Sequence, residues 1–228
     1  MELTIGAFTF RLNKQRKTAV ITHFYGGIND VNITNSITYN GLDYTIIAIE
    51  RKAFANCDRL KNITIPNSVT KIGDYAFYDC YNLNNVDIPD SVTKIGEWAF
   101  CNCGRLEDVS IPDSVTSIGD SAFLDCTSLE SIVLPDSVTS IGEYAFKGCR
   151  SLKSITIPNS MTKIGELAFY WCKGLKSVTL PDSITGIDES WFRDCSSLTE
   201  IRIPGTDKAF PLWVSLMESE YADFVQIV

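Results

Sequence analysis

The stretch SVTSIGDSAFLDCTSLESIVLPD, Ser114 to Asp136, decides the fold, because most of the chain repeats it every 23 residues. Three columns of identical residues show the period. They are Phe54, Phe77, Phe100, Phe123, Phe146, Phe169 and Phe192; Cys57, Cys80, Cys103, Cys126, Cys149, Cys172 and Cys195; and Pro66, Pro89, Pro112, Pro135, Pro158, Pro181 and Pro204. A fixed period of this length is typical of a solenoid, whose units bury their apolar faces only against neighbouring units.

The length and composition suit one elongated domain. The chain has 228 residues, 45% of them hydrophobic, and a solenoid grows by adding coils to one continuous core. Its apolar runs are shorter than the roughly 18 to 20 residues that span a bilayer, so no membrane insertion is predicted. A net charge of -8 argues against binding to nucleic acid.

Residues 1–44 do not follow the repeat and are interpreted as an amino-terminal cap. Apolar residues on both sides of a polar turn at 13–17 predict a β-hairpin. The sequence VNITNSI at 31–37 echoes ITIPNSV at 63–69 and indicates a degenerate coil. Such a cap would shield the open end of the stack and its edge strand.

Seven coils follow between residues 45 and 205. In each coil, Leu-x-x-Val-x-Ile alternates and predicts a short strand, which a proline ends. Ser-Val-Thr-x-Ile predicts a second extended piece. The coils are 45–67, 68–90, 91–113, 114–136, 137–159, 160–182 and 183–205.

The Ala-Phe-x-x-Cys part of each coil predicts a short helix on the outer side, because its apolar residues have the i, i+1, i+4 spacing of one helix face. An acidic residue precedes each predicted helix, where a carboxylate at the positive end of the dipole adds roughly 0.3 to 1 kcal/mol. This acidic column is Asp74, Glu97, Asp120, Glu143, Glu166 and Glu189. The expected fold class is therefore an α/β repeat solenoid with one short parallel strand per coil.

The core is expected to consist of the apolar columns that recur in nearly every coil. In the third coil they are Val92, Ile95, Ala99, Phe100, Cys103, Leu106, Val109 and Ile111. The last coil departs from the pattern, because Asp188 replaces the glycine and Trp191 the alanine. Residues 206–228 lose the period and are interpreted as a carboxy-terminal cap with one helix after Pro211.

The units resemble leucine-rich repeats of the BspA type. The resemblance covers residues 45–205 and rests on motifs such as LKSVTLPDSITGI at 175–187 and AFYWC at 168–172. It implies a curved, right-handed solenoid in a cell-surface or secreted protein, with roles in adhesion, matrix-protein binding and co-aggregation. No catalytic residues belong to the family, so it implies no enzyme activity and no cofactor.

The amino terminus, MELTIGAFTFRLNKQRK, lacks the basic start and apolar core of a secretory signal. Either the protein is cytosolic or a signal has been removed from this chain. The resemblance favours the second alternative, so a cell-surface or secreted location is expected.

The column cysteines are expected to be buried free thiols rather than disulfides or metal ligands. Stacked coils hold equivalent side chains parallel and about 4.8 Å apart, whereas zinc needs four converging ligands and a disulfide needs a twist of about 90°. Cys101 departs from the column. It replaces an outward-facing residue two positions before Cys103, so it is expected to react first.

Two polar columns follow the strand. The serines can bond to the backbone of their own or the next coil; they are Ser68, Ser91, Ser114, Ser137, Ser160 and Ser183. Asp90, Asp113, Asp136 and Asp182 could align as a calcium stripe. Asn67 and Asn159 interrupt that stripe and no glycine loop accompanies it, so no metal site is predicted.

Catalysis is disfavoured. His23 is the only histidine and lies in the cap, so a Ser-His-Asp or Cys-His pair would have to be built across the end of the stack. The carboxylates are dispersed along ladders, with no predicted pocket to shift their pKa values. We therefore expect a protein that is not an enzyme.

Aromatic residues at outward or rim positions of the Ala-Phe-x-x-Cys segments are the candidate partner contacts. Exposed Tyr and Trp are enriched at contact hot spots. The alternative is that these rings merely cover the flank between coils. The residues are Tyr75, Tyr78, Tyr81, Trp98, Tyr144, Tyr170 and Trp171.

Three functions are open at this point. The leading hypothesis is a non-enzymatic module that binds a host or neighbouring-cell surface protein, a matrix protein or a glycan. The rival is a stalk that holds other domains away from the cell envelope and binds nothing itself. A glycan hydrolase with its site at the cap is the third.

Overall fold

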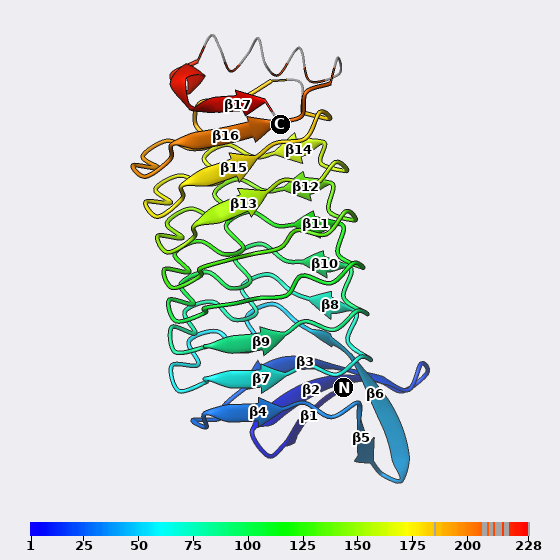
Figure 1. The fold of residues 1–228 in the computed structure, drawn as a ribbon. Coiled ribbons are helices and arrows are strands. Elements are labelled where there is room, and N and C mark those ends of the chain that lie inside the picture. The colour runs from blue at the N-terminus through cyan, green and yellow to red at the C-terminus, as the bar shows by residue number, and fades with distance from the viewer. Residues whose placement is uncertain (185, 207–208, 210–211, 213–215, 217–218, 228) are drawn as a thin grey trace.

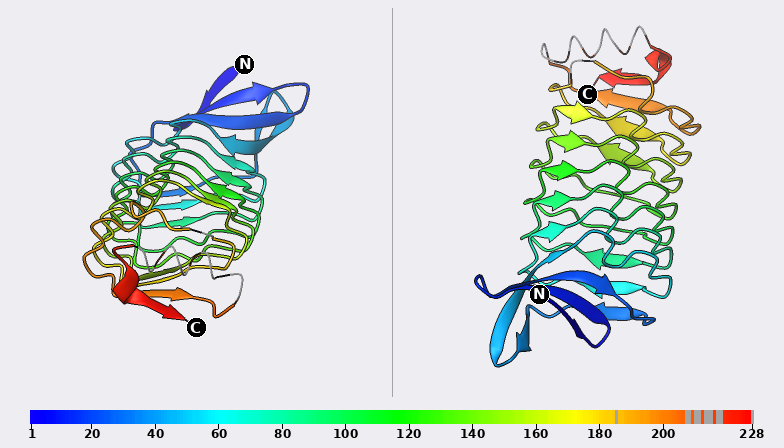
Figure 2. Two further views of the ribbon diagram at one scale, coloured as in Figure 1. Left: turned by 90° about the horizontal axis from the view of Figure 1, so that it is seen from above. Right: turned by 180° about the vertical axis from the view of Figure 1, so that it is seen from behind.

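A computed structural model describes residues 1–184, 186–206, 209, 212, 216 and 219–227. The chain winds into a stack of three-sided coils (Figure 1). The first face carries the Leu-x-x-Val-x-Ile strands, the second face the Ser-Val-Thr-x-Ile strands, and the turn face the Ala-Phe-x-x-Cys segments. The first and last strands, β1 (Glu2–Ile5) and β17 (Val225–Ile227), lie at opposite ends of the stack (Figure 2).

Strands of the first face pair in parallel with a register of one repeat. Ile63, for example, pairs with Val86, and both side chains are buried between polar, exposed neighbours. Isolated parallel β-bridges from Asp87 to Ser110 and from Ser110 to Val133 continue the first face through the third and fourth coils. Besides β17, the strands are β4 (Asp30–Asn32), β7 (Asn62–Thr64), β9 (Asn85–Asp87), β13 (Ser154–Thr156), β15 (Ser177–Thr179) and β16 (Glu200–Ile203).

Strands of the second face are shorter and form a parallel ladder of buried isoleucines. Ile72 pairs with Ile95, and the ladder continues through Ile118 and Ile141 to Ile164. The strands are β8 (Lys71–Ile72), β10 (Lys94–Ile95), β11 (Ser117–Ile118), β12 (Ser140–Ile141) and β14 (Lys163–Ile164). Within the described residues, this face ends at β14.

The predicted outer helices are wrong, because the Ala-Phe-x-x-Cys segment of every repeat is a run of turns. Two positions in these segments take a left-handed backbone, for example Trp98 (φ 57°) and Asn102 (φ 61°), which a right-handed helix does not contain. The N–H groups of Trp98, Phe100 and Asn102 each donate to a carbonyl of the next coil at 2.8 Å. Backbone groups that a helix would satisfy internally thus tie neighbouring coils together.

This hydrogen bonding also bears on the shape of the stack. All three sides are held together from coil to coil by backbone hydrogen bonds, so no layer of helices wedges the coils apart on one side. The stack runs without a marked bend in Figure 1, unlike the curved stack that the resemblance implied.

The acidic column therefore begins no helices. Asp74 Oδ1 accepts the N–H of Glu97 at 3.2 Å, and Asp120 Oδ1 accepts the N–H of Glu143 at 2.9 Å. In these two pairs the carboxylate binds the backbone of the next coil, which is a contact that only the stacked structure creates.

The amino-terminal strands extend the second face. β2 (Phe8–Asn13) pairs antiparallel with β1 and with β3 (Thr18–Phe24). β3 then pairs in parallel with β6 (Leu42–Ile49), which pairs with β8. β5 (Ser36–Tyr39) and β6 form a second hairpin, whose turn at Asn40 and Gly41 has positive φ at both residues.

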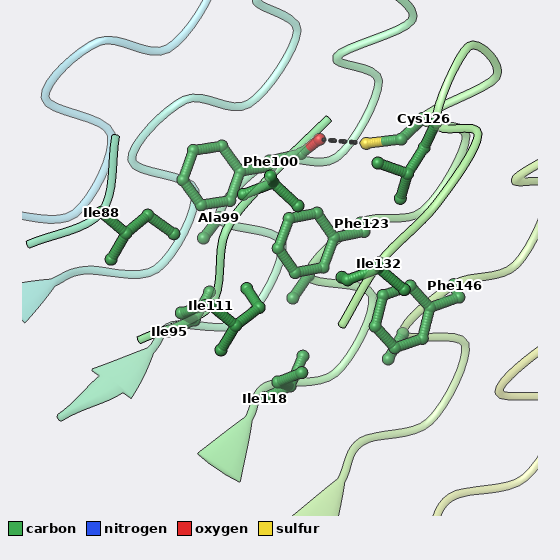
Figure 3. Close-up of a cluster of buried hydrophobic side chains, with 14 of the residues drawn as sticks. Ile88, Ile95, Ala99, Phe100, Ile111, Ile118, Phe123, Cys126, Ile132 and Phe146 are labelled. Atoms are coloured by element: carbon green, nitrogen blue, oxygen red, sulfur yellow. Dashed lines mark hydrogen bonds between the residues drawn. The ribbon is translucent and has the colours of Figure 1, made fainter. Parts of the chain in front are cut away.

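The core is one continuous column of side chains, as the apolar pattern predicted. Rings of the phenylalanine column stack on one another with centroids 5.1–5.6 Å apart and interplanar angles of 1–21°. Figure 3 shows Phe100, Phe123 and Phe146 in this stack, with isoleucines of the strand faces beside them. Each ring in the middle of the stack is therefore covered by the coil before it and the coil after it.

Aromatic residues outside the repeat cover both ends of this ring stack. Phe24 lies 5.0 Å from Phe54, and Phe8 lies 4.9 Å from Phe24, between ring centroids. At the other end the Tyr221 ring meets Phe192 edge-on at 6.0 Å. The Tyr221 hydroxyl also donates to the Glu189 carbonyl at 2.8 Å.

The carboxy-terminal segment is described in part. A 3₁₀ turn, Ala222–Phe224, leads into β17, which pairs in parallel with β16. Ala209, Leu212 and Leu216 are buried. The helix predicted after Pro211 falls mostly outside the described residues. Within those residues, no helix is long and apolar enough to cross a bilayer.

Candidate binding surface

The serine column is structural, as predicted. Ser91, Ser114, Ser137 and Ser160 each donate a hydrogen bond to the valine carbonyl of the preceding coil, at 2.5–2.7 Å. These hydroxyls are therefore occupied at the corner between the first and second faces. They hold adjacent coils in register.

The cysteine column has the same role in the interior. From Cys80 to Cys195, each column thiol donates to the phenylalanine carbonyl of the preceding coil at 3.0–3.3 Å. Figure 3 shows one such bond, from Cys126 to Phe100. Burial raises the pKa of the middle thiols, Cys126 and Cys149 among them, so they stay protonated. The prediction of buried thiols is confirmed.

The prediction for Cys101 is wrong. Its side chain is buried, with 1% of its surface exposed. Burial and the negative charges of Asp79 and Asp125 raise the pKa of Cys101 to about 12. The thiol with the lowered pKa is Cys57 in the first coil, through its hydrogen bond with the Cys80 thiol. Sequence position alone did not show that Cys101 turns inward.

The residues weighed for catalysis are not gathered into a site. The His23 ring lies 4.2 Å from Tyr25, at the surface of the amino-terminal strands. Among the described residues, no group of three or more His, Cys, Asp or Glu side chains is placed to hold a metal ion. The candidate surface is therefore the turn face.

Three of the candidate aromatics form a proximal cluster with two cations. The Tyr75 and Trp98 rings stack with centroids 5.8 Å apart and an interplanar angle of 2°, and the Tyr78 ring lies 5.6 Å from Tyr75. Arg51 and Lys52 lie over the Tyr75 ring at 4.8 and 5.6 Å. All three rings are half-buried.

A distal cluster lies three coils further along the same face. Lys147 Nζ sits 5.2 Å from the Tyr144 ring and 5.3 Å from the Tyr170 ring, so it bridges the two. The Trp171 ring has a cation from each of two coils over it, Arg150 at 4.0 Å and Lys173 at 4.8 Å. Such contacts contribute roughly 0.5–1 kcal/mol each at exposed sites.

Tyr81 stands apart from both clusters. It is 51% exposed, and its hydroxyl lies 3.5 Å from Asp58 Oδ2, on the corner that follows the turn face. The stack thus gathers six of the seven predicted contact residues into two groups and leaves the seventh beside an acid.

A left-handed backbone carries four of these six side chains. Tyr75, Trp98, Tyr144 and Trp171 all have φ between 56° and 63°. A left-handed residue that is not glycine costs about 1–3 kcal/mol, so the surrounding structure must hold it in place. The inter-coil hydrogen bonds of the turn face do so, and the rings project from a rigid backbone.

Sequence reasoning missed the cations. Lys52 occupies the position of Tyr75 one coil earlier, and Lys147 occupies the position of Tyr170 one coil earlier. Arg150 and Lys173 follow their cysteines, as Tyr81 does. Reading the outward positions as columns, as was done for the core, would have placed Lys52 beside Tyr75 and Lys147 beside Tyr170.

The clusters present ring edges and positive charge. Tyr75 and Trp98 each cover one face of the other, and cations lie over the rings of Tyr75, Tyr144 and Trp171. Ring edges, hydroxyls and ammonium or guanidinium groups are therefore among the groups offered to a partner. The charge of Asp79 raises the pKa of Tyr78, which therefore keeps its hydroxyl proton at neutral pH. The arrangement can donate hydrogen bonds and attract carboxylates, although the whole chain carries a net charge of -8.

A sequence model described as "BspA type Leucine rich repeat region (6 copies)" matches residues 29–134 and 116–211 of this chain. No curated protein matches this chain. Among solved structures, a T. pallidum leucine-rich repeat protein (TpLRR) is similar, with 27% identity, a TM-score of 0.60, and coverage of 93% of this chain and 91% of that one.

Two further bacterial structures are more distant. A leucine-rich cell surface protein from Faecalibacterium prausnitzii has 22% identity and a TM-score of 0.43, covering 92% of this chain and 96% of that one. The pneumococcal vaccine antigen PcpA has 16% identity and a TM-score of 0.45, with coverage of 89% and 87%.

Proposed function

This chain belongs to the BspA-type leucine-rich repeat family, and from that premise we propose that it is a non-enzymatic binding module of a cell-surface or secreted protein. Its turn face would hold an acidic region of a host or neighbouring-cell surface protein, or of a matrix protein. The observation that carries the proposal is the pairing of half-exposed aromatic rings with five cations in two clusters.

The geometry favours a protein over a glycan on this face. Sugar rings commonly stack on open aromatic faces, and Tyr75 and Trp98 each have one face covered by the other. A protein can meet ring edges, tyrosine hydroxyls and cations together. Because the rings are already held in place, little side-chain entropy would be lost on binding.

The test is the combined replacement of Tyr78, Trp98 and Tyr170 by alanine. Adhesion to host cells and to surfaces coated with matrix proteins should fall, while the circular dichroism spectrum and the unfolding midpoint stay close to those of the parent. A matched control replaces Ser131, Ser154 and Ser177 of the first face by alanine. Adhesion that the aromatic variant leaves unchanged would reject the turn face as the contact surface.

A charge test separates the cations from the rings. Lys52→Glu combined with Lys147→Glu should slow association with an acidic partner and reduce its salt dependence. Lys71→Glu with Lys94→Glu, on the second face, is the control of equal charge change. Equal losses from both pairs would point to the net charge rather than to this face.

The elongate stack supports the stalk as a second candidate (Figure 1). A stalk contributes length alone, so the aromatic and charge variants should adhere as the parent does. Deleting two middle coils should then impair function in proportion to the lost length. If the chain is a binding module, the aromatic and charge variants should impair function more than the deletion of two coils does.

A further inference from the structure

The net charge of the chain hides an uneven distribution. Residues 1–29 hold four basic residues and one acidic residue, whereas the rest of the chain holds 16 basic and 27 acidic residues. All four basic residues lie in one segment of seven, RLNKQRK at 11–17, which we call the basic segment. An otherwise acidic molecule thus carries one short stretch with the composition of a polyanion-binding site.

The basic segment forms the end of the β2–β3 hairpin, at the amino-terminal end of the stack (Figure 1). Residues 14–17 make its turn. The Asn13 side chain accepts the N–H of Arg16 at 3.0 Å, and the Lys17 carbonyl accepts the N–H of Thr45 at 3.0 Å. Because both ends of the turn are bonded, its side chains project from a backbone that is already held in place.

Three of the four basic side chains have no acidic partner. Lys14, Arg16 and Lys17 are exposed, and among the described residues none of these side chains forms an ion pair, a hydrogen bond or a contact with an aromatic ring. Arg11 differs, because its guanidinium lies 2.8 Å from a carboxylate oxygen of Glu50. Three like charges within four residues repel one another, and the negative charges of a ligand would relieve that repulsion.

A surface cleft of about 560 Å³ lies beside the turn. Lys14, Arg16 and Arg11 line it, and of the described residues in its lining only Glu50 is acidic. Its apolar lining comes from Met1, Leu12, Val20 and Ile47. The cleft therefore offers a ligand a second contact surface next to the unpaired cations.

The surroundings of these cations favour a polysaccharide over nucleic acid or a lipid surface. The segment RLNKQRKT, residues 11–18, contains no aromatic ring on which a base could stack. Contact with lipid would need apolar side chains in the turn itself, whose four residues are Lys, Gln, Arg and Lys. Tyr25, which is 67% exposed, lies at the opposite end of the hairpin, where its N–H donates to the Ala7 carbonyl.

Three unpaired cations in four consecutive residues need a ligand with closely spaced negative charges. Sulfate groups along a polysaccharide supply such charges, and Lys and Arg donate charge-assisted hydrogen bonds to their oxygens. A polysaccharide whose only charges are carboxylates has fewer charges per sugar. We propose that the turn of the β2–β3 hairpin and its cleft bind a linear, sulfated polysaccharide of a host cell surface or matrix. This ligand source rests on the proposed cell-surface role, but the site is separate from the turn face.

The test removes the three unpaired charges and keeps the shape of the turn. Asparagine is used at position 17 because it tolerates the left-handed backbone found there (φ 51°). The combined variant is Lys14→Gln, Arg16→Gln and Lys17→Asn. A matched control removes three exposed lysines from the second face, Lys71→Gln, Lys94→Gln and Lys163→Gln.

The probes are heparin, chemically desulfated heparin, hyaluronan, phosphatidylserine vesicles and a single-stranded oligonucleotide. The parent should bind heparin more tightly than every other probe, and its affinity should fall as salt is raised. The hairpin variant should lose about tenfold or more of the heparin affinity and most of the salt dependence, because fewer counterions are released on binding. The second-face control should stay within about twofold of the parent.

Four outcomes would overturn the proposal. They are a parent that does not bind heparin, a hairpin variant that binds it as the parent does, equal losses in the hairpin variant and the control, and tighter binding of vesicles or oligonucleotide than of heparin.

The same variants separate this site from the turn face. The hairpin variant should keep its adhesion to surfaces coated with matrix proteins, and the variant Tyr78→Ala, Trp98→Ala, Tyr170→Ala should keep its heparin binding. Loss of protein adhesion in neither variant would reject the turn face alone. Loss of heparin binding in Lys52→Glu with Lys147→Glu, but not in the hairpin variant, would place the heparin site on the turn face and reject the hairpin.

Discussion

The middle coils and the last coil share the same 23-residue sequence pattern, yet their backbones contact the preceding coil differently. In the middle coils a glycine ends each strand of the second face, and its backbone lies against the preceding coil. A methyl group on Gly119 would lie 2.7 Å from the Glu97 nitrogen, closer than real contacts allow. The last coil has Asp188 at this position, and within the described residues the second face ends one coil earlier, at β14.

This difference shows what keeps the second face together. The hydrophobic period persists into the last coil, where Ile184 and Phe192 remain buried. Within the described residues no strand is assigned at the equivalent place in the last coil, where Asp188 stands in the position of the glycine. Burial of the core thus needs only apolar residues at the right period, whereas the close approach of neighbouring backbones on the second face also needs the glycine. The predictions below test this contrast between the middle and the ends.

The largest effect is expected from the phenylalanine column. Phe123→Ala should lower the free energy of unfolding by about 3–5 kcal/mol, because it leaves a cavity between two stacked rings. Phe192→Ala in the last coil should cost less, since only one face of that ring is stacked and the other meets an edge. Denaturant unfolding of both variants measures the difference. Equal losses, or a Phe123 variant as stable as the parent, would contradict the stacked column.

The glycine contact gives the next largest effect. Gly119→Ala should destabilise the chain by about 1–3 kcal/mol, because the added methyl group meets backbone atoms that cannot move aside without parting two coils. Gly104→Ala is the matched control, since its methyl group would meet only a threonine hydroxyl at 3.5 Å. Thermal unfolding of the two variants measures the difference. If their unfolding midpoints were indistinguishable, the close approach of the backbones would not be the reason for a glycine at position 119.

A smaller effect is expected from the serine column. Ser137→Ala removes a 2.7 Å hydrogen bond to the Val115 carbonyl and should cost about 0.5–1.5 kcal/mol. Ser183 occupies the same position in the last coil, where among the described residues its hydroxyl makes no hydrogen bond, so Ser183→Ala should have no effect. Denaturation curves of both variants provide the check. A larger loss from Ser183→Ala would reverse the expected order.

The smallest change concerns reactivity rather than stability. Cys57 has a lowered pKa and lies at the end of the thiol column, whereas burial raises the pKa of Cys126 in the middle. The thiolate is the reactive form, so Cys57 should be alkylated first, and its rate should rise at a lower pH than the rates of the other thiols. Mass spectrometry after a short iodoacetamide pulse across a pH series would show the order, and Cys57→Ser should remove the early label. Earlier labelling of Cys101 would contradict its burial.

The repeat made much of this fold predictable from sequence. The period placed the core columns, and alternation within Leu-x-x-Val-x-Ile placed the strands of the first face. The serine hydroxyls were predicted to bond to neighbouring backbone, and they do so toward the preceding coil. These predictions succeed because each depends on one side chain and on the position of its equivalent one repeat away.

The turn face was harder to predict, because its pattern fits two backbones. The spacing of Ala99, Phe100 and Cys103 turns the same side chains inward in a helix and in the observed run of turns. Only the partners of the backbone hydrogen bonds distinguish the helix from the run of turns, and those partners lie on the next coil. The same limitation misplaced Cys101, whose neighbours in space come from other coils. The aromatic clusters were found in part, since the rings were recognised and their cations were not.

The sequence by itself determined the period, the inward columns and the family, because identical residues at one interval can satisfy their burial only by stacking. The tertiary structure alone decided where the backbone hydrogen bonds of the turn face go, which cation lies over which ring, and where the second face ends. The hydrogen bonds between coils on the turn face join atoms that are 22 residues apart in the chain, and such distances exist only once the coils have stacked.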